Sequence, residues 1–392
     1  MAGIKDLPVE VIVMVFSTFD DIETLLVALL VCRQFFDAYN TWPSVALKIL
    51  QQQIGSALLP YAIAISKISR MDTTSLTIVE DLLDSLFKAP DSLTLERHEF
   101  SMPDCLGMSN LHSLIHSFAH SFASDAWHTL YPRPSDQFVL SSTEERHFCR
   151  AFYRVEVILA VCKYSNFMAD RAWFRKFVDA FCDSHSPWIR EQLACVSSYH
   201  HKRFFEATRD FLANNTEVNE MYSRGVAFRP PTSLEYREQA LISKGVMFIH
   251  KLESAASREN QRTALLSVLA VSRRRHCSLY DFMWMSCRKD DGREPRLIEL
   301  HGFTKEQLNT LGSPREYGET DEGPYIAWRS TREYCSWPSF VSRYTNAPLL
   351  PTAYVLWDST RIDRYNMLDT IRDFKGEPGR AIRQRRARWL LA

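Results

Sequence analysis

The stretch 144–164, EERHFCRAFYRVEVILAVCKY, decides the class of fold for most of the chain. Its main apolar residues recur every three or four positions, which is the spacing of one face of an α-helix. They are Phe148, Phe152, Val155, Leu159 and Cys162. The segments 187–214, 233–254 and 257–275 repeat this period, and in 233–254 it places Leu241, Gly245, Phe248 and Leu252 on one side of a helix. The sequence therefore predicts a mainly α-helical protein.

The glycine content supports the same class of fold. Only 12 of 392 residues are glycine, which argues against a β-rich fold with many tight turns and against a doubly wound α/β fold. From residue 296 onward the helical period loosens into short aromatic and proline-containing pieces, with which a few short strands are also compatible. We expect a larger irregular helical domain after a small N-terminal module.

Charge and cysteine usage narrow the classes of partner. Lysine plus arginine equals aspartate plus glutamate, at 47 each, so the chain has no overall field that would attract nucleic acid or anionic lipid. The longest apolar stretch is far shorter than the roughly 20 residues that a membrane span needs. Nine cysteines without a repeated spacing favour reduced, buried thiols in the cytoplasm or nucleus. We expect a soluble protein that binds neither nucleic acid nor membrane.

The N-terminal segment is unusually apolar. In residues 4–19, IKDLPVEVIVMVFSTF, Pro8 fits the first helical position and Glu10 could bond back to the N–H of Leu7. Val11 to Phe16 are all apolar, so this helix is hydrophobic on every side. Asp20 is expected to cap a second apolar helix, which contains Leu25 to Cys32 and ends near Arg33, and a third helix begins at Phe35.

A module of about 50 residues cannot bury this much apolar surface alone, because small domains bury a smaller fraction of their surface than large ones. Two coverings remain open on the pattern alone. One is the surface of a partner protein. The other is the remaining 340 residues of the same chain.

Residues 7–40, LPVEVIVMVFSTFDDIETLLVALLVCRQFFDAYN, resemble the F-box. The shared features are the Leu-Pro-x-Glu opening, an aliphatic helix, an acidic turn, Leu-Leu and Val-Cys-Arg. The resemblance implies three helices that dock the Skp-type adaptor of a cullin ubiquitin ligase, while the rest of the chain holds a target. By position, the implied docking residues are Leu7, Pro8, Val11, Val15, Leu25, Leu26, Val31, Cys32 and Phe35.

The sequence departs mildly from the F-box pattern. Val11 and Val15 stand where longer aliphatic residues are usual, Phe19 replaces a leucine and Thr24 replaces an aspartate. Smaller side chains would weaken docking. The rest of the chain is similar to F-box-like proteins of filamentous fungi in three motifs, to which no chemistry is attached. They are RAFYRVE at 150–156, SPWIREQLACV at 186–196 and YVLWDSTRIDRYNML at 354–368.

One histidine series could hold a metal ion. His112, His116 and His120 follow at intervals of four residues and would line one face of a helix. However, the outer two would lie roughly 12 Å apart by helix rise, which is too far for one ion. No glutamate forms an H-E-x-x-H motif, and interleaved serines are typical of a polar face. We therefore expect no metal ligand.

Four other groups have simpler interpretations. His200 and His201, beside basic residues late in a helix, fit a structural role at the negative end of the helix dipole. The group of His276, Cys277 and Cys287 fits core packing. The carboxylates at 290–294 fit a solvated loop, and the arginine-rich tail at 380–388 fits a solvated helix face or a nuclear import signal.

These patterns together predict residues 1–54 as an F-box-like module and residues 55–392 as a helical body that recognises a target. We expect a non-catalytic substrate adaptor of a Skp-cullin-F-box ubiquitin ligase, without catalytic residues or cofactor. One alternative is a structural or scaffold protein whose N-terminal helices pack internally. Another is a metal-dependent enzyme that uses the face of His112.

Overall fold

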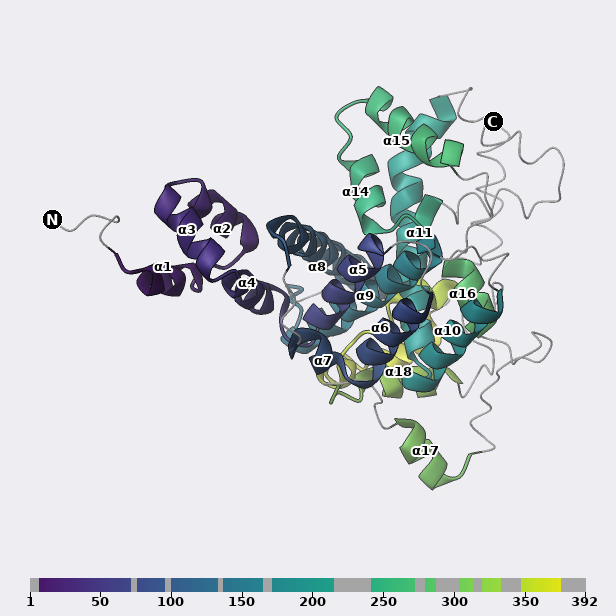
Figure 1. Cartoon of the computed structure of the whole chain (residues 1–392). Coiled ribbons are helices and arrows are strands. Elements are labelled where there is room, and N and C mark those ends of the chain that lie inside the picture. Colours follow the sequence, from purple (N-terminus) through teal and green to yellow (C-terminus); the bar gives the residue numbers. More distant parts are fainter. Residues whose placement is uncertain are drawn as a thin grey trace. The chain divides into compact units, whose positions relative to one another are not determined.

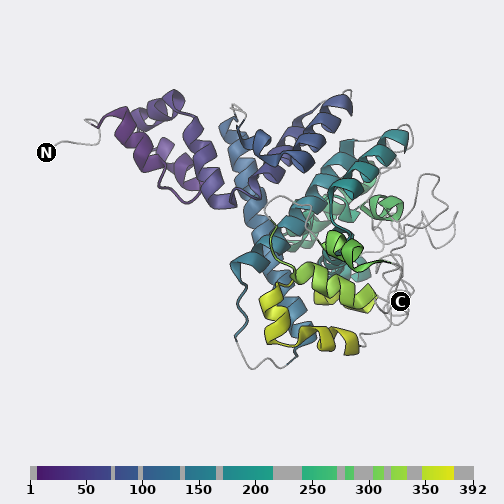
Figure 2. The ribbon, with the colours of Figure 1, turned by 90° about the horizontal axis from the view of Figure 1, so that it is seen from below.

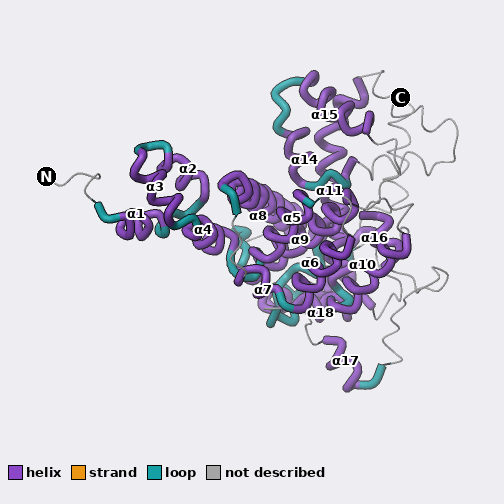
Figure 3. Tube along the Cα trace, in the orientation of Figure 1, coloured by secondary structure: helices purple, strands orange, loops and turns teal. Residues whose placement is uncertain are grey.

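The predicted mainly α-helical class is confirmed in the described residues. The computed structural model describes residues 7–71, 76–95, 100–132, 137–164, 171–214, 241–271, 279–286, 303–312, 319–332 and 347–374. All regular elements in these ranges are helices (Figure 3). None of these helices combines the length and apolar character needed to cross a bilayer.

The C-terminal part is also helical where it is described, and no short strand occurs there. The period loosens because these helices are short, six to ten residues each. They are α17 (Lys305–Gly312), α18 (Gly323–Arg332), the 3-10 helix η3 (Ala347–Thr352), α19 (Ser359–Arg364) and α20 (Met367–Asp373). Helices α18, α19 and α20 pack together (Figure 2).

The chain divides into two compact units, Met1–Ile115 and His116–Ala392. The predicted boundary after residue 54 coincides with the end of a helix inside the first unit. That helix packs against the next one in sequence, so contacts continue across the position. The long helix α8 (Met102–Leu130) runs through the boundary between the units.

The first unit begins with a cluster of four short helices (Figure 1). They are α1 (Val9–Phe16), α2 (Ile22–Leu29), α3 (Arg33–Thr41) and α4 (Ser44–Ile54), and they are followed by α5 (Leu59–Arg70), α6 (Leu76–Lys88) and α7 (Pro90–Leu95). Helix α3 packs against α1 and α2, and α4 packs against α2 and α5. The interior of this cluster contains the edge-to-face ring pair of Phe16 and Phe35, with centroids 5.4 Å apart.

Several predicted details of the N-terminal helices are wrong. Asp21, not Asp20, caps α2, because its carboxylate accepts a hydrogen bond of 2.7 Å from the backbone N–H of Thr24. Pro8 precedes the first helical residue, and α1 has no side-chain cap at Glu10 or elsewhere. Helix α2 ends at Leu29 rather than near Arg33, and α3 begins at Arg33 rather than at Phe35.

The second unit is built around α9 (Ser142–Tyr164), whose apolar stripe at 148–162 is buried as predicted. Helix α9 packs against α11 (Ile189–Asn214) and α16 (Leu279–Ser286). Helix α11 also contacts α14 (Val246–Glu253) and α15 (Arg258–Val271), and α10 (Arg171–Ser184) packs against α16. Aromatic rings fill the space between α8, α9 and α11, where Phe122 stacks on Tyr199 at 4.5 Å.

A buried polar chain joins the three sequence motifs of the body. Arg154 of α9 donates a hydrogen bond of 3.0 Å to the side-chain oxygen of Gln192 in α11. The amide nitrogen of Gln192 donates in turn to the carbonyl of Val355, at 2.9 Å. In the same region Arg332 of α18 pairs with buried Glu191. Because such groups are costly to bury unpaired, they fix which helix faces meet.

A second set of buried charges fixes the C-terminal segment on the start of α9. Arg361 of α19 forms a two-pronged ion pair with Glu144, at 2.5 and 2.7 Å, and its guanidinium lies over the rings of Trp127 and Trp357. Asp358 caps α19 and accepts a hydrogen bond of 2.6 Å from Ser141. A two-pronged pair such as that of Arg361 and Glu144 specifies the geometry of the contact as well as contributing energy.

A third buried pair joins residues far apart in sequence. His147 and Arg150 of α9 contact the carboxylate of Glu319 at 3.1 and 3.2 Å. Burial alone would raise the pKa of Glu319, but the hydrogen bond from His147 and the charge of Arg150 outweigh it and lower that pKa to about 2. Glu319 therefore stays ionised, and its contribution to stability is lost only as the pH falls from the ordinary value of 4.5 toward 2.

Residues 233–240 of the predicted helix over 233–254 lie outside the described residues, and within its described part Gly245 is the N-cap of α14 instead of a helical residue. Its φ of +82° is a left-handed conformation that glycine adopts without strain. It precedes α14, where the buried carboxylate of Glu156 accepts a hydrogen bond of 2.8 Å from the N–H of Val246. A Cβ atom at position 245 would lie 2.4 Å from an oxygen of Glu156. Both the backbone and the neighbouring carboxylate thus require glycine.

We expect Gly245→Ala to lower the free energy of unfolding by about 1–3 kcal/mol from backbone strain alone, and further because the Glu156 carboxylate must move. Urea unfolding of the full chain measures this change. Gly107→Ala is the matched control, since an added Cβ at Gly107 in α8 meets no atom within 4 Å and alanine favours helix. Equal stability of the two variants would contradict the assigned role of Gly245.

Two fully buried histidines make the second unit sensitive to acid. The structure corrects the prediction for His200, which is not near a helix end but in the middle of α11, at 0% exposure and against Phe152. Burial lowers the pKa of His200 from 6.5 to about 3, and burial followed by the charge of Arg154 lowers the pKa of His185 to about 3 as well. Both side chains are therefore neutral in the folded protein.

We expect the free energy of unfolding to fall as the pH drops below 6.5, because the unfolded chain takes up protons there and folded His185 and His200 do not. Between about pH 7.5 and about pH 5.5 each histidine accounts for a loss of about 1.4 kcal/mol. His200→Leu, an apolar replacement, removes one of these two losses. Urea unfolding at both pH values measures the difference, and an acid loss in the variant as large as in the wild type would refute it.

Candidate functional site

Exposed apolar side chains are concentrated in the N-terminal helices. Of the twelve large hydrophobic residues that are exposed in the described chain, nine lie between Leu7 and Trp42, and the others are Ile78, Val139 and Met247. The nine are Leu7, Val11, Met14, Val15, Val27, Leu30, Val31, Phe36 and Trp42. Such a concentration marks a candidate protein-binding surface, which we call the N-terminal apolar surface.

Helix α1 shows how this surface arises. Ile12 and Phe16, one turn apart, are buried at 1% and 0% exposure and pack into the four-helix cluster. Val11 and Val15 are also one turn apart and lie on a neighbouring face of α1, with 39% and 47% of their surface exposed. The helix is apolar on both faces, and its own cluster covers only one of them.

The predicted docking residues fall into three groups. Five are exposed: Leu7, Pro8, Val11, Val15 and Val31. Three are partly exposed: Leu26, Cys32 and Phe35. Leu25 is fully buried, because it lies on the inner face of α2 with Ile22 and Leu29. It belongs to the interior of the cluster and is not available to a partner in this conformation.

Five further apolar residues are exposed that are not among the predicted docking residues. Met14, Val27, Leu30, Phe36 and Trp42 are exposed, and Leu30 has the largest exposed fraction, 79%. The signal that could have found Met14 is its offset by two residues from both Ile12 and Phe16, which places it on the opposite face of α1. Leu30 and Val31 follow the last turn of α2, where the helical period no longer applies.

Three buried cysteines of the described chain are unreactive thiols. Cys105, Cys149 and Cys195 are buried. Burial raises the pKa of Cys105 and of Cys149 to about 12 and that of Cys195 well above its ordinary value. These thiols are protonated at neutral pH and pack as small apolar groups.

Only one group of side chains in the described chain has the composition and spacing of a metal site: His116, His120 and Glu145. His112, the first member of the predicted series, is buried and is not part of the group. His276, Cys277, Cys287, the carboxylates at 290–294 and the arginine-rich tail lie outside the described residues.

No protein-family model, curated protein sequence or solved structure matches this chain. The geometry defines a helical protein with a localised apolar surface at one end of the sequence.

We expect Leu25→Ala to destabilise the first unit by about 2–5 kcal/mol, because it removes a fully buried leucine and leaves a cavity. Val31→Ala should change the free energy of unfolding by no more than about 0.5 kcal/mol, because Val31 is 65% exposed. Thermal unfolding of both variants measures the contrast. A costly Val31→Ala change would show that Val31 is covered by the protein itself.

Proposed function

We propose that this protein is a non-catalytic substrate adaptor of a Skp-cullin-F-box ubiquitin ligase. The N-terminal apolar surface docks the Skp-type adaptor, and the helical body recruits an as yet unidentified target protein. The chain itself makes and breaks no covalent bond. It acts in the cytoplasm or nucleus by bringing the target close to the ubiquitin carrier, since proximity alone can supply much of the rate.

The observation that supports this proposal is the exposure of apolar residues within the F-box-like stretch. Nine exposed large hydrophobics in 36 residues, from Leu7 to Trp42, contrast with three in the rest of the described chain. An unpartnered surface of this kind costs solubility, and a permanent partner removes that cost. The F-box resemblance supplies the identity of that partner.

The arrangement of α1 to α3 fits docking in physical terms. The buried side chains Ile12, Phe16 and Leu25 hold the three helices together, so the exposed ones are presented on a preformed scaffold. A preformed surface loses less conformational entropy on binding than a flexible one. Val11 and Val15 present less apolar area than longer aliphatic residues would, so we expect Leu30, Val31 and Met14 to contribute much of the contact.

The alternative of an internally packed module makes a different prediction. A scaffold protein whose N-terminal helices pack against its own body would run as a single species alone and would not retain the Skp-type adaptor. Leu30 and Met14 are 79% and 68% exposed, so the first unit by itself does not cover them, and retention of the adaptor distinguishes the two interpretations.

The test is co-expression with the Skp-type adaptor followed by size-exclusion chromatography and measurement of the dissociation constant. We expect the wild type to co-elute with the adaptor. Val15→Glu combined with Val31→Glu should weaken binding by about thirtyfold or more, because truncating or charging a central interface residue commonly costs about 2 kcal/mol. Both residues are already exposed, so the fold should be retained.

The matched control is Ile78→Glu in α6, an exposed apolar residue of the same unit at 51% exposure. This variant carries a similar new charge outside the N-terminal apolar surface and should bind like the wild type. Absence of co-elution with the wild type would refute the proposal. Equal binding by the double variant would place the interface elsewhere.

A further inference from the structure

Two histidines and a glutamate from different helices meet in the second unit. Helix α8 places His116 and His120 one turn apart, with ring centroids separated by 4.3 Å. Glu145 in the first turn of α9 reaches both histidines. One of its carboxylate oxygens lies 2.7 Å from Nε2 of His116 and 3.7 Å from Nε2 of His120.

Each of these side chains projects from a firmly held backbone. The histidines belong to a long helix whose neighbouring residues Phe118 and Phe122 are buried. At the start of α9, Ser141 and Glu144 cap the helix reciprocally, with hydrogen bonds of 3.0 and 3.1 Å. Glu144 is further fixed by its ion pair with Arg361. The position of Glu145, the next residue, is thereby set opposite the histidines.

We propose that His116, His120 and Glu145 form a binding site for a single zinc ion. Two imidazoles and one carboxylate are a donor set that zinc prefers. One donor atom from each residue lies within 4.8 Å of the others. Ligands at about 2.1 Å in a tetrahedron are separated by about 3.4 Å, so small rotations of these side chains bring all three into place.

The exposure of the group permits both entry of the ion and this adjustment. The side chains of His116, His120 and Glu145 are 45%, 44% and 40% exposed. His112 is excluded because it lies two turns from His120, roughly 12 Å along the helix. Helix α8 has no glutamate beside these histidines. The third ligand is therefore Glu145 of α9, and not His112.

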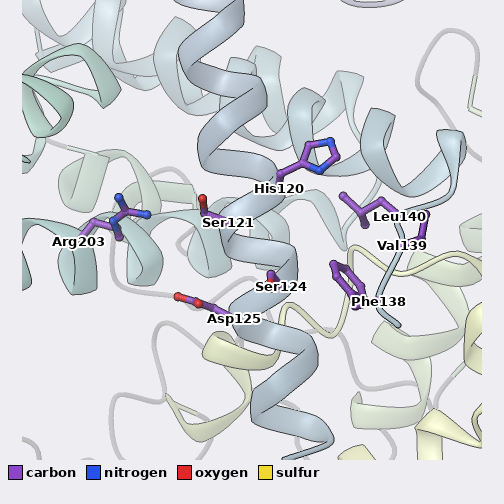
Figure 4. Close-up of a pocket in the computed structure, with 8 residues that line it drawn as sticks. All are labelled: His120, Ser121, Ser124, Asp125, Phe138, Val139, Leu140 and Arg203. Atoms are coloured by element: carbon purple, nitrogen blue, oxygen red, sulfur yellow. The ribbon is translucent and has the colours of Figure 1, made fainter. Parts of the chain in front are cut away.

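Three protein ligands leave one tetrahedral position open. His120 also lines a pocket of about 660 Å³ between α8, the segment 138–140 and α11 (Figure 4). Phe138 and Val139 give this pocket an apolar wall, and Asp125 and Arg203 give it a polar one. The open position is suited to water or to a donor atom of a molecule bound in the pocket. Ser117 occupies the position of the glutamate base in H-E-x-x-H proteases, so the proposed role is binding of the ion.

This site lies wholly within the second unit and uses none of the N-terminal apolar surface. Its existence therefore does not depend on docking of the Skp-type adaptor. Loss of either property would leave the other intact, and separate measurements distinguish them.

The experiment is zinc titration of the full-length, chelator-treated protein by isothermal calorimetry, with elemental analysis after dialysis. We expect one zinc ion per chain and a rise in the thermal unfolding temperature on its addition. His120→Ala and Glu145→Gln should each weaken binding by about tenfold or more, since even loss of groups behind the ligands costs that much. Cobalt substitution provides a second readout, because its visible spectrum reports four-coordinate binding.

His128→Ala is the matched control. His128 lies on the same helix, is exposed and bonds to the carbonyl of Ser124, so its removal should leave zinc affinity unchanged. Glu145→Gln keeps the size of the side chain, and circular dichroism verifies that its helix content matches the wild type. No zinc binding by the wild type, or equal binding by Glu145→Gln and His120→Ala, would overturn the proposed site.

Discussion

The second unit depends on the hydrogen-bonded chain from Arg154 through Gln192 to the carbonyl of Val355. Apolar packing among α9, α11 and the C-terminal segment is favourable in many registers, because the hydrophobic effect has little directionality. The buried side chains of Arg154 and Gln192 can make these two hydrogen bonds in few arrangements. The polar chain therefore selects one register from many that would bury similar area.

The other buried charges extend this selection to the ends of the unit. Arg361 joins α19 to the first turn of α9 through Glu144, and Glu319 joins a loop to His147 and Arg150. Each pair links residues more than 150 positions apart in the sequence. Their net contribution to stability is modest because burying charge is costly, but loss of one partner leaves an uncompensated charge. They act mainly as determinants of the arrangement.

The two units use apolar residues in opposite ways. In the second unit, the described apolar residues are almost all internal and its polar groups are partly buried in pairs. In the first, the eight-residue helices α1 and α2 bury one face and leave other apolar residues exposed. The proposed role as a substrate adaptor would use both parts, the exposed apolar surface for a partner and the body for a target.

The sequence by itself determined the helical class, the core stripe of α9 and the excess of apolar residues near the N-terminus. These features follow from composition and from the helical period, which places residues three or four positions apart on the same face of one helix. Only the tertiary structure decided that Leu25 is internal while Val31 is exposed, that Gly245 precedes a helix instead of lying within one, and that His200 is buried and neutral. It also brought Glu145 to His116 and His120. A helical period orients residues within one helix, whereas contacts between helices depend on packing across distances that no local spacing encodes.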